Sequence, residues 1–165
     1  ILKKMGADVR TEIDNDKAVF EAYPLGDKAL KAIVLDAENI PDLVPLIAIL
    51  TCFTDGKTQI SGIKRLRLKE SDRLIATEEL IDGLGGSFKI HEDAIEISGL
   101  GAGAMLRGGE VRCFDDHRIV MSAAVSSLRC REDVLIDNAF AVNKSYLGFF
   151  DELDRLGLSS KCIRK

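Results

Sequence analysis

The chain has 165 residues, of which 46% are hydrophobic and 30% are charged, a composition that is ordinary for one globular domain with a real core. The net charge of −4 argues against a general nucleic-acid partner, and the lack of any run of about 18 apolar residues argues against a membrane partner. No basic and then apolar leader opens the sequence, and the four cysteines lack metal-ligand spacing. We therefore predict a cytoplasmic protein with reduced thiols and no metal site.

The first residues predict the end of a helix and then a hairpin. Residues 1–6 resemble a last helical turn closed by Gly6, which suggests that the sequence begins inside an element. Alternating residues at 7–13 and 18–23 flank a turn-forming stretch at 14–17, which predicts two antiparallel strands.

The middle of the chain predicts a longer series of elements. Pro41 and Asp42 precede an apolar helix at 43–53, and a strand follows at 58–63. A second helix is expected at 74–84, and a second hairpin at 87–91 and 94–98.

The last third repeats the beginning of this series. A helix is expected at 119–128, a strand at 134–138 and a helix at 146–156. Asp42 and His117 are 75 positions apart, and so are Lys69 and Lys144. Equal offsets at separate landmarks indicate an internal repeat.

The predicted fold class is therefore α+β, built from repeated βαβαββ units. We expect the end of one unit at 1–35, a second unit at 36–100 and a third, incomplete unit at 101–165. Such apolar helices must be covered, so we expect four-stranded sheets to enclose them.

The sharpest motif is the run Lys69-Glu70-Ser71-Asp72-Arg73 at a strand-to-helix junction. Ser71 or Asp72 suits a helix cap, and the free N–H groups of a first helical turn attract anions. Lys69 and Arg73 are four residues apart, so both suit one ligand. The alternative is a solvated helix start with ordinary ion pairs.

Three further motifs lie at helix starts: Asn39 to Asp42, Asp115 to Arg118, and Asn143 to Tyr146. Asp115 to Arg118 alone is explained equally well by a structural role such as capping, and the other two alone are better explained by such a role. Repeated units place equivalent junctions on one edge of a domain, however. That edge would combine cations, carboxylates and one imidazole, as binding and acid–base chemistry on a phosphorylated, carboxylated substrate require. Its members would be Asp42, Lys69, Glu70, Arg73, His117, Arg118 and Lys144.

Together these motifs resemble the 5-enolpyruvylshikimate-3-phosphate synthase family in order and spacing. The matching runs are the Lys69 to Arg73 run, Asp116-His117-Arg118 with Met121, the Asn39 to Asp42 turn, and Lys144-Ser145-Tyr146. The family usually has Pro where Leu147 stands, which predicts a looser loop around Lys144.

The resemblance implies transfer of the enolpyruvyl group of phosphoenolpyruvate to the 5-hydroxyl of shikimate 3-phosphate, without a cofactor. It implies a two-domain enzyme with its substrates in the cleft, of which this chain would be the C-terminal part. The partner of this chain would then be the N-terminal half of the same enzyme. We expect the chain alone to be inactive and to self-associate through truncated faces.

The resemblance also implies a role for each site residue. Asp42 and Lys69 would contact the shikimate substrate and move its proton, and Glu70 would handle the proton of the phosphoenolpyruvate methylene. A second group, Arg73, Arg118 and Lys144, would hold phosphoenolpyruvate. His117 would support Glu70 or the leaving phosphate.

Three other functions stay open at this point. UDP-N-acetylglucosamine enolpyruvyl transferase and RNA 3′-terminal phosphate cyclase share the architecture. A non-catalytic anion-binding module belongs to a different class. The Lys69 to Arg73 run and the Asp116 to Arg118 run favour the shikimate enzyme.

Overall fold

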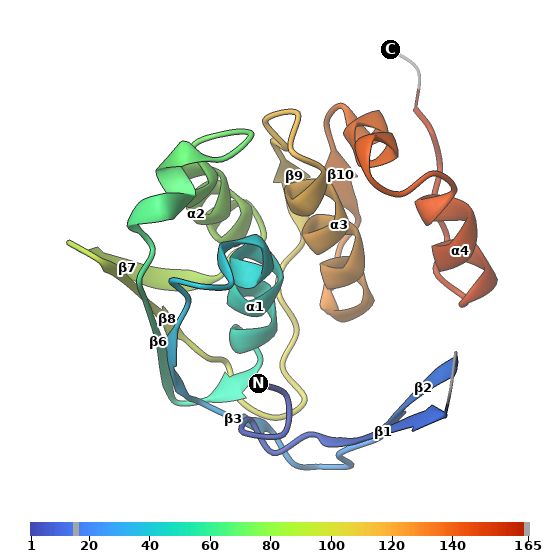
Figure 1. Cartoon of the computed structure of the whole chain (residues 1–165). Helices are drawn as coiled ribbons and strands as arrows, with labels where there is room; N and C mark the ends of the chain where they lie inside the picture. The colour runs from blue at the N-terminus through green and yellow to red at the C-terminus, as the bar shows by residue number, and fades with distance from the viewer. Residues whose placement is uncertain (15–16, 164–165) are drawn as a thin grey trace.

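The computed structural model describes residues 1–14 and 17–163 (Figure 1). Its elements follow in chain order: β1 (Asp8–Asp14), β2 (Lys17–Tyr23), β3 (Leu30–Lys31), β4 (Val34–Asp36), η1 (Pro41–Leu43), α1 (Val44–Thr51), β5 (Thr54–Asp55), β6 (Lys57–Ser61), η2 (Lys64–Leu68), α2 (Arg73–Gly83), β7 (Ser87–His91), β8 (Ala94–Ser98), β9 (Gly109–Val111), α3 (His117–Ser126), η3 (Ser127–Arg129), β10 (Val134–Ile136), η4 (Ala139–Lys144) and α4 (Phe149–Arg155).

One four-stranded sheet carries the first complete unit, with strand order β4-β6-β8-β7. β4 and β6 are parallel, whereas β6 pairs with β8, and β8 with β7, in antiparallel fashion. Alternate residues of β6 and β8 are buried, and Ile60 lies opposite Ile95 in the register. The buried face of the sheet packs against the helices, as the period of two in these strands requires.

Helices α1 and α2 pack against this sheet, and α3 packs beside α1 and α2 (Figure 1). α1 is apolar all round, and six of its eight residues are buried. A helix without a polar face must be surrounded by protein, so α1 is the centre of the core. Val44, Ala48 and Cys52 are completely inaccessible to solvent.

The 75-position offset reappears in the strand pairing. Val34 of β4 lies opposite Gln59 of β6, and Gly109 of β9 lies opposite Val134 of β10, both in parallel pairs. Each member of the first pair stands 75 positions before its counterpart in the second. The fold is thus α+β with repeated βαβαββ connectivity, in which β9, α3, β10 and α4 follow the same path as β4, α1, β6 and α2.

Three helical turns end in the same closing motif. At Gly6, Gly85 and Gly157 the glycine N–H and the next N–H donate to carbonyls three and five residues earlier. All three glycines have positive φ, between 81° and 95°, in the left-handed region that a side chain disfavours. The turn expected at Gly6 is confirmed.

Most predicted elements are present with shifted ends. The hairpin at 87–91 and 94–98 is confirmed residue for residue, and the strands flanking 14–17 pair as β1 and β2. Asn15 and Asp16 of that turn lie outside the described residues. The helix expected from Tyr146 begins only at Phe149, because Gly148 is left-handed at φ 78°.

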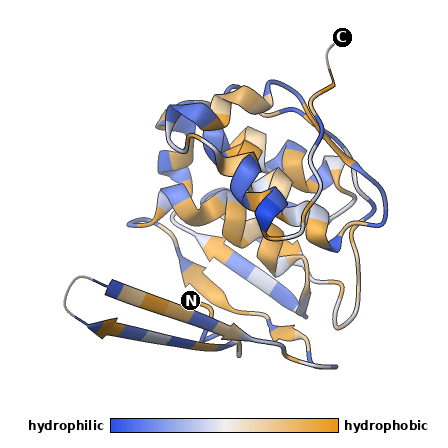
Figure 2. Cartoon of the chain, turned by 90° about the vertical axis from the view of Figure 1, so that its right-hand side faces the viewer, coloured by the Kyte–Doolittle hydropathy of each residue, from blue (hydrophilic) through white to orange (hydrophobic). Residues whose placement is uncertain are grey.

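The hairpin of β1 and β2 stands apart from the helices and has an uncovered apolar face (Figure 2). One face holds Val9, Ile13, Ala18 and Phe20, whereas charged residues dominate the other. Ile13 and Phe20 are each 76% exposed. Among the described residues, no helix is both long enough and apolar enough to cross a membrane.

Candidate active site

The first turns of α1, α2 and α3 meet at one end of the molecule (Figure 1). The parallel pairs β4–β6 and β9–β10, 75 positions apart, make α1 and α3 run in the same direction. Asp42 precedes α1 in η1, Arg73 begins α2, and Asp116 caps α3. Three segments far apart in the sequence therefore share one charged edge.

Asp42 lies at the centre of the exposed part of this edge. Its Oδ1 is 2.7 Å from Arg73 Nη1 and 3.2 Å from Lys69 Nζ, and its Oδ2 is 3.4 Å from Arg118 Nη2. Partial burial raises the pKa of Asp42, but the hydrogen bonds from Lys69 and Arg73 outweigh it and hold that pKa below its ordinary value. Asp42 is therefore a carboxylate at neutral pH.

Arg73 is the buried centre of the network. Its guanidinium donates to Asp42, to Glu70 and to Asp116, and its side chain has no exposed surface. Burial lowers the pKa of Arg73, but the Asp116 carboxylate outweighs this and raises it. Arg73 and Asp116 form an ion pair that is fully inaccessible on both sides.

Two caps explain why α2 and α3 start here. The Asp72 carboxylate accepts from the Ile75 N–H at 3.2 Å and also from Arg67 at 3.0 Å. The Asp116 carboxylate accepts from the Arg118 N–H at 2.9 Å. Short carboxylate side chains satisfy the free N–H groups of a first turn, and the helix dipole favours their charge.

The loop before α3 has an unusual backbone. Phe114 and Asp115 both have positive φ, 54° and 57°, although neither is glycine. Such residues are sparse outside functional sites and cost on the order of 1–3 kcal/mol each. Asp115 accepts from Lys144 and, at 3.0 Å, from the Asn138 amide, so η4 holds this loop.

Five of the seven predicted site residues are joined by direct ion pairs: Asp42, Lys69, Glu70, Arg73 and Arg118. Lys144 reaches the same end of α3 through Asp115, one residue before the Asp116 cap. His117 is buried in the first turn of α3, and its Nδ1 has no hydrogen-bond partner among the described residues. The structure thus places six of the seven at three adjacent helix starts, and it links Lys144 to the third start through Asp115.

Sequence reasoning missed two contributions. Asp116 was expected as a cap, and its ion pair with Arg73 could not be read from a spacing of 43 positions. Ser71, whose hydroxyl donates to Asp116 at 3.0 Å, was likewise expected only as a cap. The one sequence signal for these roles was that Ser71 lies in the Lys69 to Arg73 run and Asp116 in the Asp115 to Arg118 run.

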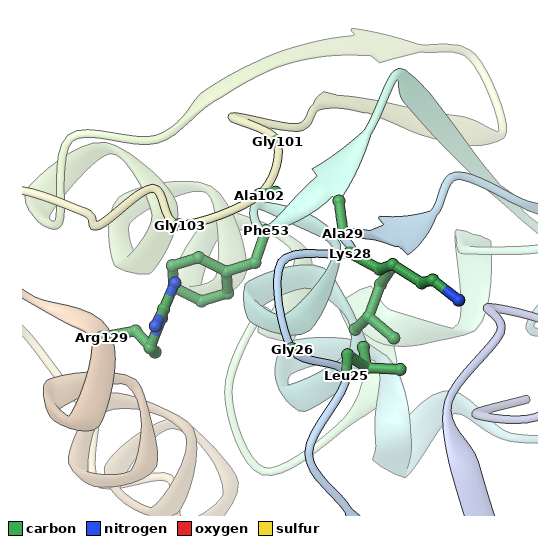
Figure 3. Close-up of a pocket in the computed structure, with 10 residues that line it drawn as sticks. Leu25, Gly26, Lys28, Ala29, Phe53, Gly101, Ala102, Gly103 and Arg129 are labelled. Atoms are coloured by element: carbon green, nitrogen blue, oxygen red, sulfur yellow. The ribbon is translucent and has the colours of Figure 1, made fainter.

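The charged edge is open and lies apart from the two pockets described here. The larger pocket, about 270 Å³, is lined by Phe53, Arg129 and Lys28 among others, with Arg129 stacked 5.9 Å from the Phe53 ring centre (Figure 3). The second, about 260 Å³, lies beside Asp36 and Asp93. Neither contains a residue of the ion network. In residues 1–14 and 17–163 no metal-binding group of three ligands occurs.

The repeated units give this chain a fold of the enolpyruvyl-transferase type. The structure of EPSP synthase from Acinetobacter baumannii superposes with a TM-score of 0.84 and 30% identity, over 96% of this chain and 38% of that one. The enolpyruvyl transferase NikO from Streptomyces tendae superposes at 0.73 over 96% of this chain and 34% of that one, with 21% identity, so it supports the fold alone.

The sequence comparisons identify the family. The family described as EPSP synthase (3-phosphoshikimate 1-carboxyvinyltransferase) matches residues 1–153, and the chain belongs to it. Relatives named 3-phosphoshikimate 1-carboxyvinyltransferase from Clostridium novyi and Methanocaldococcus jannaschii are 39% and 36% identical, each over 95% of this chain. The chain spans 34% of the length of each of them.

Proposed function

We propose that the protein carrying this chain transfers the enolpyruvyl group of phosphoenolpyruvate to the 5-hydroxyl of shikimate 3-phosphate and releases phosphate. The observation that carries this proposal is the ion network of Asp42, Lys69, Glu70, Arg73 and Arg118. These residues come from the motifs that resemble the family, and the chain belongs to that family.

The proposed reaction has an addition step and an elimination step. In the addition, the 5-hydroxyl oxygen bonds to C2 of phosphoenolpyruvate, its proton passes to the Asp42 carboxylate beside Lys69, and a protonated Glu70 gives its proton to the methylene carbon. In the elimination, the carbon–oxygen bond to phosphate breaks, Glu70 takes a proton back from the new methyl group, and inorganic phosphate departs with the proton that Asp42 had accepted. A positioned acid or base contributes about 10²–10⁴-fold to such steps.

Three cations of the edge suit the anionic groups of the substrates. We propose that Arg118 and Lys144 bind phosphoenolpyruvate and that Lys69 contacts shikimate 3-phosphate. An arginine fork binds two oxygens of a carboxylate or phosphate at once. The buried His117 is assigned to support Glu70 or the leaving phosphate.

Arg73 needs a separate account, because its donors already have protein partners. Asp42 and Glu70 occupy its outward side, and both are about half exposed. A ligand carboxylate or phosphate that reaches Arg73 would replace one of them. That exchange would also free Asp42 or Glu70 for proton transfer.

Catalysis at this solvent-exposed edge requires a further part of the protein that encloses the substrates from the other side. The near-attack geometry of two substrates is worth several orders of magnitude in rate, and an open edge supplies little of it. Because this chain spans 34% of its relatives, we propose that another part of the enzyme closes the site. We further propose a cytoplasmic location without nucleic-acid partners, in line with the net charge of −4 and the free cysteines of the described part.

The test is a phosphate-release assay on two preparations. The full-length protein is expected to release phosphate only when both phosphoenolpyruvate and shikimate 3-phosphate are present. The 165-residue chain alone is expected to release none. Release with UDP-N-acetylglucosamine in place of shikimate 3-phosphate would overturn the assignment, and release by the chain alone would overturn the need for a further part of the protein.

A further inference from the structure

Asp116 accepts hydrogen bonds from two side chains besides capping its helix, and it has no exposed surface. Its Oδ1 accepts from the Arg118 N–H at 2.9 Å, which caps α3. Its Oδ2 accepts from Ser71 Oγ at 3.0 Å and from Arg73 Nε at 2.9 Å. Arg73 Nη2 lies 3.3 Å from Oδ1. One carboxylate therefore fixes the starts of both α2 and α3.

The guanidinium of Arg73 has an inner and an outer side. Asp116 holds the inner side through Nε and Nη2, and its own exposure is zero. The outer side meets Asp42 at 2.7 Å from Nη1 and Glu70 at Nη2. Asp42 and Glu70 are 45% and 50% exposed, so they separate the guanidinium from solvent.

The repeat gives an independent reason to regard this pair as special. The position 75 before Asp116 is Pro41, and the position 75 after Arg73 is Gly148. Neither residue can form an ion pair. The βαβαββ unit therefore folds without a buried Arg–Asp pair at these positions, so its presence between α2 and α3 is not a requirement of the repeat.

We infer that Asp116 is a positioning residue, which holds Arg73 with its outer side turned toward the place where the anionic substrate binds. In the free site, Asp42 and Glu70 occupy that place as exchangeable carboxylates. This inference rests on the proposed function and adds to it a residue that touches no substrate.

The charge of Asp116, more than its hydrogen-bonding capacity, is what the role requires. A buried guanidinium needs a paired carboxylate, because removing one partner leaves an uncompensated charge. Asparagine caps helices as well as aspartate does, so Asp116→Asn keeps the bond to the Arg118 N–H. It loses the ion pair with Arg73, because an amide carries no negative charge, and it keeps only one acceptor oxygen.

The experiment compares Asp116→Asn with a matched control, Asp72→Asn, in the full-length protein. Asp72 caps α2 and pairs with Arg67, but among the described residues its carboxylate forms no hydrogen bond or ion pair with the guanidinium of Arg73. We expect Asp116→Asn to lower kcat/KM for phosphoenolpyruvate roughly 10²-fold, since misplaced binding groups cost about that much. KM for shikimate 3-phosphate should change by less than about threefold. Asp72→Asn should leave both parameters near the wild type.

Equal losses in the two variants, or an unchanged kcat/KM in Asp116→Asn, would overturn the inference. Should Asp116→Asn fail to fold, Ser71→Ala removes one bond to the same carboxylate and should cost roughly fivefold in the same parameter. An unchanged kcat/KM for phosphoenolpyruvate in Ser71→Ala would also contradict the inference.

A structural measurement separates this inference from the proposed function. In a crystal structure of Asp116→Asn, the Arg73 side chain should leave its present position, whatever reaction the protein catalyses. An unmoved Arg73 would refute positioning by Asp116. A wild-type protein without transferase activity would refute the proposed function. It would not refute the positioning of Arg73 by Asp116, which the crystal structure tests separately.

Discussion

Glu70 is a half-exposed carboxylate whose bond to Arg73 orients it toward the open edge. In the full-length enzyme we predict that Glu70→Gln lowers kcat by about 10²–10⁴-fold, because it removes a proton-transfer group. KM should change far less, since the amide keeps the shape and one acceptor oxygen. Steady-state kinetics with both substrates checks this. Near-normal turnover would mean that Glu70 only supports the helix start.

The buried pair of Arg73 and Asp116 should also make stability depend on pH. Burial raises the pKa of Asp116, but the hydrogen bonds from Arg73 and the Arg118 N–H outweigh it, so the pKa lies below the ordinary 3.8. A lowered pKa contributes stability that is present above pH of about 4 and is lost as the pH falls further.

We therefore predict that Asp116→Asn unfolds more readily at pH 7 yet loses less of its remaining stability between about pH 5 and pH 2 than the wild type. Urea unfolding of the purified chain across this range measures both effects. As a control, Glu92→Gln removes a carboxylate that is 93% exposed and should keep the wild-type acid dependence. The prediction would be contradicted if the free energy of unfolding fell equally steeply with decreasing pH in Asp116→Asn and in the wild type.

At the residue scale, the sequence was informative about which side chains gather and silent about which are buried. Charged motifs at helix starts, combined with a 75-position repeat, predicted the shared edge. The burial of Arg73 depends on Asp116, 43 positions away, and no local pattern encodes that contact. Within residues 1–14 and 17–163, Nδ1 of His117 has no hydrogen-bond partner, which is likewise a consequence of tertiary packing.

At the scale of the elements, the glycine closures are the most predictable feature. Gly85 ends α2 at φ 81°, and an added Cβ would lie 3.2 Å from the Cβ of Arg107. We predict that Gly85→Ala destabilises the chain by about 1–2 kcal/mol, the cost of a left-handed backbone with a side chain. Urea unfolding measures it, with Glu79→Ala on the exposed side of α2 as the control. Equal stability of the two variants would show that the turn relaxes.

Element boundaries were less predictable, for reasons that lie in the backbone. The apolar pattern from Tyr146 suggested a helix start, but Gly148 adopts a left-handed conformation and delays α4 to Phe149. Asn138, at φ 39°, similarly ends β10 before the predicted residue. Around Lys144, where Leu147 replaces the usual Pro, Tyr146 stacks edge-on with Phe149 at 5.6 Å. These contacts arise after the chain folds back, so periodicity alone does not show them.

At the scale of the whole molecule, the division into repeats explains where apolar surface stays uncovered. A repeat unit buries its apolar face only when its neighbours are present. β4, β6, β8 and β7 have helices against them, whereas the hairpin of β1 and β2 does not (Figure 2). The charged edge at the helix starts, by contrast, keeps half-exposed side chains that favour water and small anions.

We predict that the isolated chain self-associates through the apolar face of the β1–β2 hairpin and not through the charged edge. Exposed apolar faces and free strand edges drive association. Sedimentation velocity at increasing concentration should show dimers or larger species for the wild type. The double variant Ile13→Ser with Phe20→Ser should stay monomeric, because it removes the two most exposed apolar side chains of that face.

Val19→Ser is the control, since Val19 lies on the opposite face of the same hairpin and is 52% exposed. A wild-type chain that is monomeric at every concentration would contradict the prediction, as would a crystal contact that buries Lys69, Arg118 or Lys144.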